Sequence, residues 1–245
     1  MKTRFTLSAS LVGFAAAALV GGTALAAGTA HVALAAGTAA VCGSVTLDGA
    51  APAMQKIKMD ADPVCQQAHK DSVTDETVLS SGGKLQNVIV YIKEVPGTYP
   101  APTTPVVLTQ EGCQYKPHAF TIQAGQPLQI INNDATLHNI NCQPKLNKKF
   151  NIAQPAKGMK SNKSFDQPEV ISFKCNVHPW MNAHAIVTNN PFSAVTDAGG
   201  SFTLANLPAG TYTVEAWHEK YGSQTQSVTV VDGSTKQISF TFKAS

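Results

Sequence analysis

An all-β fold is predicted from three features of the sequence. The apolar stretches are short and are interrupted by turn residues, a pattern typical of strands rather than helices. Glycine and proline are frequent, with 18 and 14 copies, while only 13% of the 245 residues are charged. The chain after its N-terminal stretch contains no long amphipathic helical pattern. Since 43% of the residues are hydrophobic, the chain can form an ordinary soluble core, in one large β domain or two small ones.

The N-terminus has the features of an export signal. Two basic residues precede an apolar run over residues 11–20, which two glycines end. Small residues suited to cleavage follow, ending at Ala26 and again at Ala35. We expect residues 1–26 to be a signal peptide, with cleavage as late as residue 35 as the alternative. Because the apolar run is shorter than the ~20 residues that a membrane span needs, we expect a periplasmic or otherwise exported protein with no membrane span in its mature form.

The charge balance argues against nucleic acid as a partner. Removal of Lys2 and Arg4 with the signal leaves 16 of the 18 basic residues against 15 acidic ones, so the formal charge falls from +3 to +1. A small cluster of lysines over residues 145–149 remains. It is either a solvated loop or a patch that steers an acidic protein.

Two segments carry most of the functional information. In the first, Gly125 leads into an alternating apolar strand, a polar loop and the pair His138-Asn139. In the second, one strand ends at Cys175 and another begins after Met181. The loop between these strands has the form Cys-x-x-His-x-x-Met and offers three potential metal ligands.

The spacing of these residues predicts one metal site with His138, Cys175, His178 and Met181 as ligands. Two imidazoles, a thiolate and a weak axial thioether suit copper in both of its oxidation states. A buried cysteine or methionine alone is usually part of a core, so the prediction depends on the conjunction of all four residues. Zinc also accepts histidine and cysteine, but methionine is a poor zinc ligand, and we therefore expect one type 1 copper ion.

Residues 115–187, which contain both segments, resemble a cupredoxin (type 1 blue copper protein), and the ligand loop is most similar to that of amicyanin. The resemblance implies a Greek-key β-sandwich in which Asn139 hydrogen-bonds to the segment that carries Cys175 and braces the thiolate. It also implies that His178 is the ligand nearest the solvent and the point where electrons pass. Trp180 either covers the metal or contacts a partner.

A second pattern follows the ligand loop. Turns at residues 197–200 and 207–210 separate strands of alternating residues. These residues are similar to the carboxypeptidase regulatory-like domain, a transthyretin-type β-sandwich. The opening of that motif, Gly-x-Val and then Gly-x-x-Pro, lies far upstream over residues 43–52. With no motif for hydrolysis or phosphate binding, we interpret this domain as a scaffold or docking surface.

The split motif predicts a nested organisation. Residues 42–95 with 190–245 would form the smaller, transthyretin-like β-sandwich, and residues 96–189 would form the Greek-key cupredoxin sandwich inserted into it. Insertion of a domain is tolerated where the ends of a host loop lie close together. The alternative is a tandem in which residues 42–188 are one enlarged cupredoxin.

Five cysteines fit an oxidising compartment. With Cys175 assigned to copper, Cys42, Cys65, Cys113 and Cys142 allow three full pairings. We favour Cys65 with Cys113, because both lie in turn-rich segments near the expected junction of the domains. Cys142 can equally remain a buried free thiol.

The expected function is single-electron transfer between periplasmic partners such as a c-type cytochrome or a periplasmic dehydrogenase. The alternative is a copper-binding or chaperone protein without an electron-transfer role. An enzyme of the copper nitrite reductase kind needs a further copper site with its own histidines, and we find none in the sequence, so we do not expect an enzyme. His118, His184 and His218 are expected at the surface or at a sheet edge, with a second metal site as the alternative.

Overall fold

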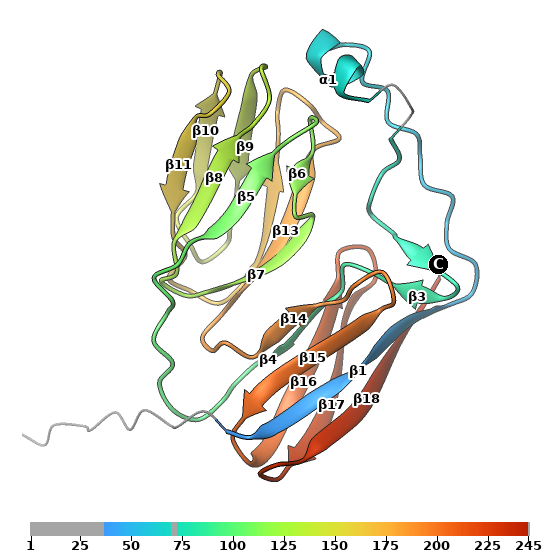
Figure 1. Ribbon diagram of the computed structural model, residues 1–245, viewed down its shortest axis with the longest axis vertical. Coiled ribbons are helices and arrows are strands. Elements are labelled where there is room, and N and C mark those ends of the chain that lie inside the picture. Colours follow the sequence, from blue (N-terminus) through green and yellow to red (C-terminus); the bar gives the residue numbers. More distant parts are fainter. Residues whose placement is uncertain (1–36, 70–72, 245) are drawn as a thin grey trace, which may run out of the picture. The chain divides into compact units, whose positions relative to one another are not determined.

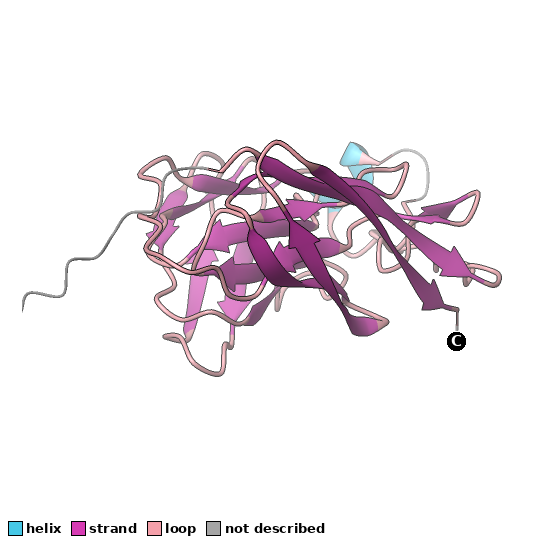
Figure 2. Cartoon of the chain, turned by 90° about the horizontal axis from the view of Figure 1, so that it is seen from below, coloured by secondary structure: helices cyan, strands magenta, loops and turns pink. Residues whose placement is uncertain are grey.

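The computed structural model describes residues 37–69 and 73–244, and the predicted signal peptide at residues 1–26 lies outside them. Almost all regular structure in the described residues is β, which confirms the predicted all-β class (Figure 1, Figure 2). The one helix there is α1 (Pro63–Ala68). In the described part of the chain, no helix has the length and apolar character to cross a membrane.

The first sandwich consists of two sheets, whose strands all come from one continuous stretch of the chain. Its strands are β5 (Val106–Gln110), β6 (Tyr115–Lys116), β7 (Ala119–Gln123), β8 (Leu128–Asn132), β9 (His138–Cys142), β10 (Phe150–Gln154), β11 (Lys160–Lys163), β12 (Val170–Lys174) and β13 (Asn182–Thr188). One sheet has the order β10-β9-β12-β13-β7 and the other β11-β8-β5-β6. Along β12, exposed and buried residues alternate, as expected for a strand with one face on a core.

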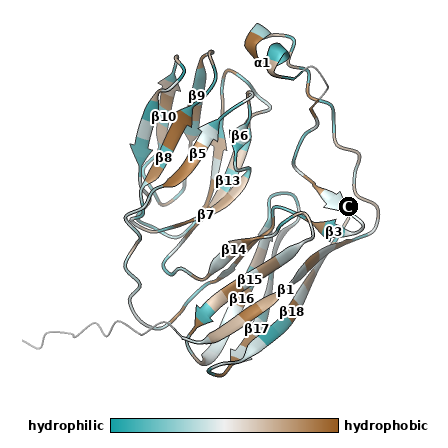
Figure 3. Ribbon diagram, viewed as in Figure 1, coloured by the Kyte–Doolittle hydropathy of each residue, from teal (hydrophilic) through white to brown (hydrophobic). Residues whose placement is uncertain are grey.

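Aromatic and aliphatic side chains fill the space between these two sheets. The rings of Phe120 and Phe173 stack with centroids 5.7 Å apart, and Phe165 meets Phe173 edge to face. Hydrophobic residues along β8 supply part of the same core (Figure 3). Cys175 and Met181 belong to this cluster, so two of the predicted ligands are placed by the packing of the sandwich.

The second sandwich combines strands from both ends of the described chain. Its strands are β1 (Ala39–Asp48), β2 (Ser80–Ser81), β3 (Lys84–Leu85), β4 (Ile89–Ile92), β14 (Ser193–Val195), β15 (Ser201–Leu207), β16 (Gly210–His218), β17 (Gly222–Val230) and β18 (Thr235–Lys243). One sheet runs β15-β1-β3-β2, with β18 also paired to β1, and the other runs β14-β4-β16-β17. Strand β1 is antiparallel to β15 and parallel to β18.

The chain leaves the second sandwich after β4 and returns to it before β14. These two points lie together, because Ile92 N donates a hydrogen bond of 3.0 Å to Phe192 O and Tyr91 is paired with Ser193. A nested organisation requires this proximity, and it also requires upstream strands to share sheets with downstream ones. We therefore propose the nested organisation rather than the tandem.

A small buried cluster contains residues of both sandwiches. Ile89 of β4 packs with Ala119 of β7 and Ile186 of β13, and the half-buried rings of Tyr91 and Trp217 pack against them. The contact is apolar, so it contributes through the removal of hydrophobic surface from water.

Candidate metal centre

The predicted ligands lie at the ends of three strands and are all buried. His138 is the first residue of β9, Cys175 follows β12, and Met181 precedes β13. The exposed fractions are 0% for His138, 3% for Cys175, 2% for His178 and 1% for Met181. The four side chains are therefore shielded from solvent.

Three of the four ligands bring their donor atoms to one point. The Nδ1 atoms of His138 and His178 are 2.9 Å apart, and Cys175 Sγ lies 3.9 Å from His178 Nδ1. The nitrogen and sulfur donors of these three residues lie within 4.8 Å of one another, so they can hold one ion. Met181 lies in the same buried cluster as Cys175.

Backbone hydrogen bonds close the loop that carries three of these ligands. Cys175 N donates to Met181 O at 3.1 Å, and Met181 N donates to His178 O at 2.9 Å. Strands β12 and β13 on either side pair directly, with Lys174 opposite Asn182. The ligand loop is thus a tight connection between paired strands, and it brings Cys175, His178 and Met181 close together.

The sulfur of Cys175 is held as a thiolate. Burial disfavours the charged form, but hydrogen bonds from His138 and His178 and from the backbone N–H groups of Asn139 and His178 outweigh it and lower the pKa of Cys175 to about 5. The two N–H groups lie 3.5 and 3.4 Å from Sγ. The deprotonated form, which binds metals, is therefore present at neutral pH.

Asn139 makes the contact that the family resemblance implied. Its Oδ1 accepts a hydrogen bond from Asn176 N, next to Cys175, and its Nδ2 donates to Asn151 Oδ1. The side chain thereby ties the strand that carries His138 to the ligand loop.

Two carboxylates orient the ligand histidines. His138 Nε2 lies 2.9 Å from Asp134 Oδ2, and His178 Nε2 lies 3.1 Å from Asp62 Oδ2. A carboxylate on Nε2 fixes the imidazole tautomer and leaves Nδ1 for a metal, as in many metal sites. The sequence interpretation missed both residues. Asp134, four residues before His138, offered a local signal, whereas Asp62 lies 116 positions from His178 and offered none.

The expectation that His178 is the ligand nearest the solvent is wrong. Its outer edge is covered by the N-terminus of α1, where Asp62 Oδ2 and Cys65 Sγ lie 3.1 and 3.5 Å from Nε2. Asp62 also caps α1, since its Oδ1 accepts a hydrogen bond from Val64 N at 2.8 Å. A segment from well before the strands of the first sandwich therefore covers the histidine.

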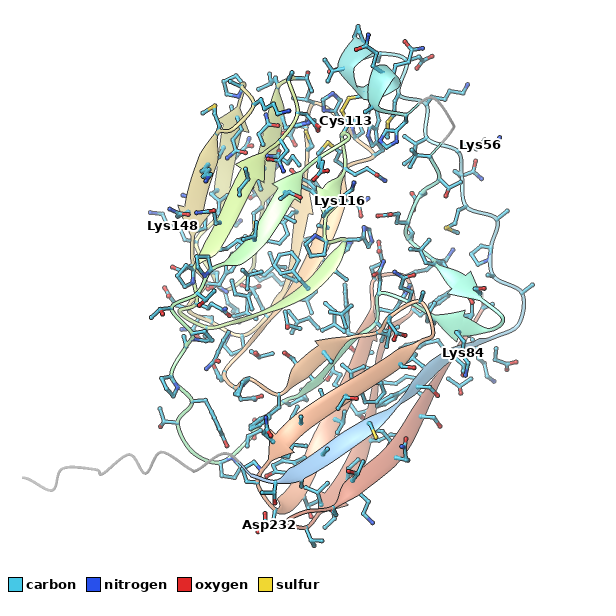
Figure 4. All side chains as sticks on the ribbon, viewed as in Figure 1. Lys56, Lys84, Cys113, Lys116, Lys148 and Asp232 are labelled. Carbon is cyan, nitrogen blue, oxygen red and sulfur yellow. A yellow bond between two sulfur atoms is a disulfide. The ribbon has the colours of Figure 1, made fainter. Side chains whose placement is uncertain are left out.

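The favoured disulfide is present, but its surroundings differ from the expectation. Cys65 is bonded to Cys113, which is labelled beside α1 in Figure 4. The bond lies at the ligand loop rather than at the junction of the domains, because Cys65 Sγ contacts His178. Cys142 is a buried free thiol, and burial raises its pKa to about 12. Cys42 is also free.

Trp180 packs beside the site. Its ring centroid lies 5.1 Å from that of His178, and its Nε1 donates a hydrogen bond of 2.9 Å to Cys113 O. The half-buried ring also packs against the core of the first sandwich. Of the two roles considered for Trp180, these contacts favour a cover over the site.

Two of the remaining histidines are not where the sequence placed them. His118 and His218 are buried, with exposed fractions of 8% and 1%, so their expected position at the surface is wrong. His118 approaches Glu219, and the ring of His218 stacks on Tyr221 with centroids 4.9 Å apart. The sequence could not reveal the contact of His118 with Glu219, since the two residues are 101 positions apart.

The thiolate gives the metal-free protein a pH-dependent stability. The ordinary pKa of 9.0 falls to about 5 for Cys175 in the folded chain. A thiol whose pKa is lower in the folded than in the unfolded chain contributes its full stabilisation of the fold above the unfolded pKa. This contribution is lost as the pH falls from about 9 to about 5. We expect the ultraviolet absorbance of the thiolate to disappear near pH 5 in the metal-free protein. In a Cys175→Ala variant the same pH titration should show no change near pH 5, and a native chain without a transition near pH 5 would contradict the prediction.

Comparison with known proteins gives two family matches. Residues 102–188 match the copper binding proteins of the plastocyanin/azurin family, and residues 178–243 match the carboxypeptidase regulatory-like domain. No curated protein matches the sequence.

Comparison with solved structures finds matches that each cover less than half of this chain. A Cu(I) amicyanin variant is 18% identical, with a TM-score of 0.31 and coverage of 34% of this chain and 81% of that chain. A purple cupredoxin from Nitrosopumilus maritimus is 21% identical, with a TM-score of 0.30 and coverage of 34% and 99%. A copper-containing nitrite reductase from Thermus scotoductus is 19% identical, with a TM-score of 0.33. That match covers 39% of this chain and only 25% of the reductase.

Proposed function

We propose that this chain, with its cupredoxin-like and carboxypeptidase regulatory-like regions, is an exported blue copper protein that transfers single electrons between periplasmic redox partners. The observation that carries the proposal is the convergence of one thiolate and two imidazoles, from Cys175, His138 and His178, on one buried point. One type 1 copper ion, when bound there, supplies the one-electron chemistry by alternating between Cu(I) and Cu(II).

The protein's own residues fix the ligand positions in advance. Asp134 and Asp62 hold the two imidazoles, and backbone N–H groups hold the Cys175 sulfur. Ligands held this way need little rearrangement when the charge at the site changes, which favours electron transfer. Met181, buried beside them, is proposed as the weak axial ligand.

The burial of the ligands supports electron transfer over the chaperone alternative. A chaperone must exchange its ion with a partner, so its ligands need to be accessible, whereas none of the four here is more than 3% exposed. Electron transfer needs no such access, because an electron can pass through a thin protein cover.

Copper titration of the mature chain tests this proposal. We expect one equivalent to bind and to produce an intense visible thiolate-to-copper band that disappears and returns on reduction and reoxidation. Slow removal of copper by a chelator would support the electron-transfer role. Rapid, complete removal would favour the chaperone, and a preference for zinc in an oxidising buffer would contradict the type 1 assignment.

Met181 should tune the site rather than hold it. We expect Met181→Leu to keep the copper and the visible band but to raise the reduction potential, because the weak donor that stabilises Cu(II) is lost. Voltammetry of the native and substituted proteins measures the shift. If Met181→Leu lost the metal, Met181 would be a stronger ligand than we propose.

Because His178 is covered, we propose that partners dock on exposed apolar residues that flank the ligands. Val177 and Leu137 precede His178 and His138 in sequence and are 44% and 41% exposed. We expect Val177→Glu to slow electron exchange with a c-type cytochrome or a periplasmic dehydrogenase by ~10-fold, about 1.4 kcal/mol, with an unchanged visible spectrum. Leu146→Glu, at a site 65% exposed in another loop, is the matched control. Equal rates for both variants would show that the docking surface lies elsewhere.

A further inference from the structure

We propose that His118, His184 and Glu219 form a second metal site, for a divalent ion of the zinc class, that links the two sandwiches. The three residues are distinct from the proposed copper ligands. Their donor atoms lie within 4.8 Å of one another, as expected for side chains that share one ion. His118 precedes β7 and His184 lies in β13, while Glu219 lies in the turn between β16 and β17 of the other sandwich.

The carboxylate of Glu219 faces both imidazoles. Its Oε1 contacts His118 Nε2, and its Oε2 lies 3.1 Å from His184 Nε2. Ligand atoms bound to a tetrahedral zinc ion at ~2.0–2.1 Å lie ~3.4 Å apart. The observed spacing is therefore close to that of a bound set, and an ion can enter with small side-chain movements.

The other ring nitrogen of His184 has a hydrogen-bond partner outside the group, and that of His118 lies near a carboxylate. His184 Nδ1 lies 3.1 Å from Ser172 Oγ, and His118 Nδ1 lies 3.8 Å from Glu76 Oε2. Histidines that bind metals commonly direct their second nitrogen to such a group, which fixes the tautomer. Both Nε2 atoms face the carboxylate of Glu219, so the same ion can reach them.

An unpartnered oxygen lies on the strand that carries His184. Asn182 is two residues before His184 and so lies on the same face of β13. Its Oδ1 is buried and has no hydrogen-bond partner among the described residues. Asn182 thus offers an acceptor on the face of β13 that carries His184, and a water molecule can take the open fourth position of the ion.

The donor set selects the class of ion. Two imidazole nitrogens and one carboxylate oxygen, without a thiolate, suit divalent zinc, which accepts three protein ligands and an open fourth position. Calcium and magnesium prefer sites made of oxygen atoms alone. Because the ligands come from both sandwiches, the ion would hold them together and stabilise the folded chain through binding.

Zinc uptake by the full mature chain tests the site. We expect the native protein to bind one more equivalent of Zn²⁺ than a Glu219→Gln variant, in both the copper-loaded and the metal-free protein, as measured by equilibrium dialysis and metal analysis. Glu219→Gln and His184→Gln should each weaken the zinc affinity by at least ~10-fold, and Ser172→Ala by ~10-fold. Glu94→Gln, at an exposed carboxylate outside the site, is the control and should bind as the native protein does.

Thermal unfolding distinguishes a metal site from a simple ion pair. Zinc should raise the Tm of the native chain and of Glu94→Gln but not that of Glu219→Gln. A Tm that is lower in Glu219→Gln by the same amount with and without zinc would show an ion pair only and overturn the proposal. Equal zinc uptake by the native and Glu219→Gln proteins would also overturn it. Because the comparison holds without copper, failure of the blue copper assignment would not affect it.

Discussion

Replacing Cys175 with serine should abolish the intense visible band of the copper-loaded protein. A serine hydroxyl stays protonated at neutral pH, so the site loses its one soft anionic ligand, while His138 and His178 remain. The copper affinity should fall by more than the ~10–100-fold that loss of an outer partner costs, since a direct ligand is removed. Visible spectroscopy and competition with a chelator measure the two effects.

Cys142→Ser is the matched control for this experiment. Cys142 is also a buried free cysteine in the cupredoxin core, but it lies outside the ligand group. Its substitution should leave the band and the copper affinity intact, with at most a loss of stability. A coloured Cys175→Ser protein would show that the thiolate of Cys175 is not the ligand.

The second large effect concerns the fold. Residues 190–245 expressed alone should not form a cooperative domain, because the sheets of the second sandwich then lack β1 and β4. To the core of the second sandwich, the missing strands supply five buried Val, Leu or Ile side chains, Val41, Val45, Leu47, Val90 and Ile92. At ~1.5–3 kcal/mol each, their burial contributes roughly 8–15 kcal/mol. This is as large as the whole stability of a typical domain, ~5–15 kcal/mol.

A linked variant provides the control. Replacing residues 96–189 with a short Gly/Ser linker should give a soluble, cooperatively unfolding β domain, because the host ends already meet at the hydrogen bond between Ile92 and Phe192. Thermal unfolding followed by circular dichroism compares the two proteins. A cooperative transition in the fragment 190–245 alone would contradict the nested organisation.

The sequence was most informative where the chemistry depends on short spacings. The ligand loop lies between two strands that follow each other in the sequence, and Asn139 is next to His138. Their positions could therefore be predicted from short stretches of sequence. The pairing of Cys65 with Cys113 was also correct, although the reason was not. It was argued from turn-rich segments near a junction, whereas the bond lies beside His178.

What the sequence could not show depends on contacts between distant segments. Asp62 and Cys65 cover His178 from 116 and 113 positions away, so no spacing rule predicts a buried ligand. Glu219 meets His118 across 101 positions and across two sandwiches. Each residue is ordinary in its own segment, and only the fold brings them together.

The pairing of β1 with β18 also has a consequence for the order in which the protein folds. Thr46 lies beside Thr241, so the first and last described strands meet only after the whole chain is available. The strands of the first sandwich lie between them in sequence and pair among themselves, so this sandwich can form while the later strands are still being synthesised. The second sandwich, held by such distant contacts, should close last and slowly. A chain that stops before β18 would thus contain the first sandwich with its candidate metal centre, attached to an incomplete second sandwich.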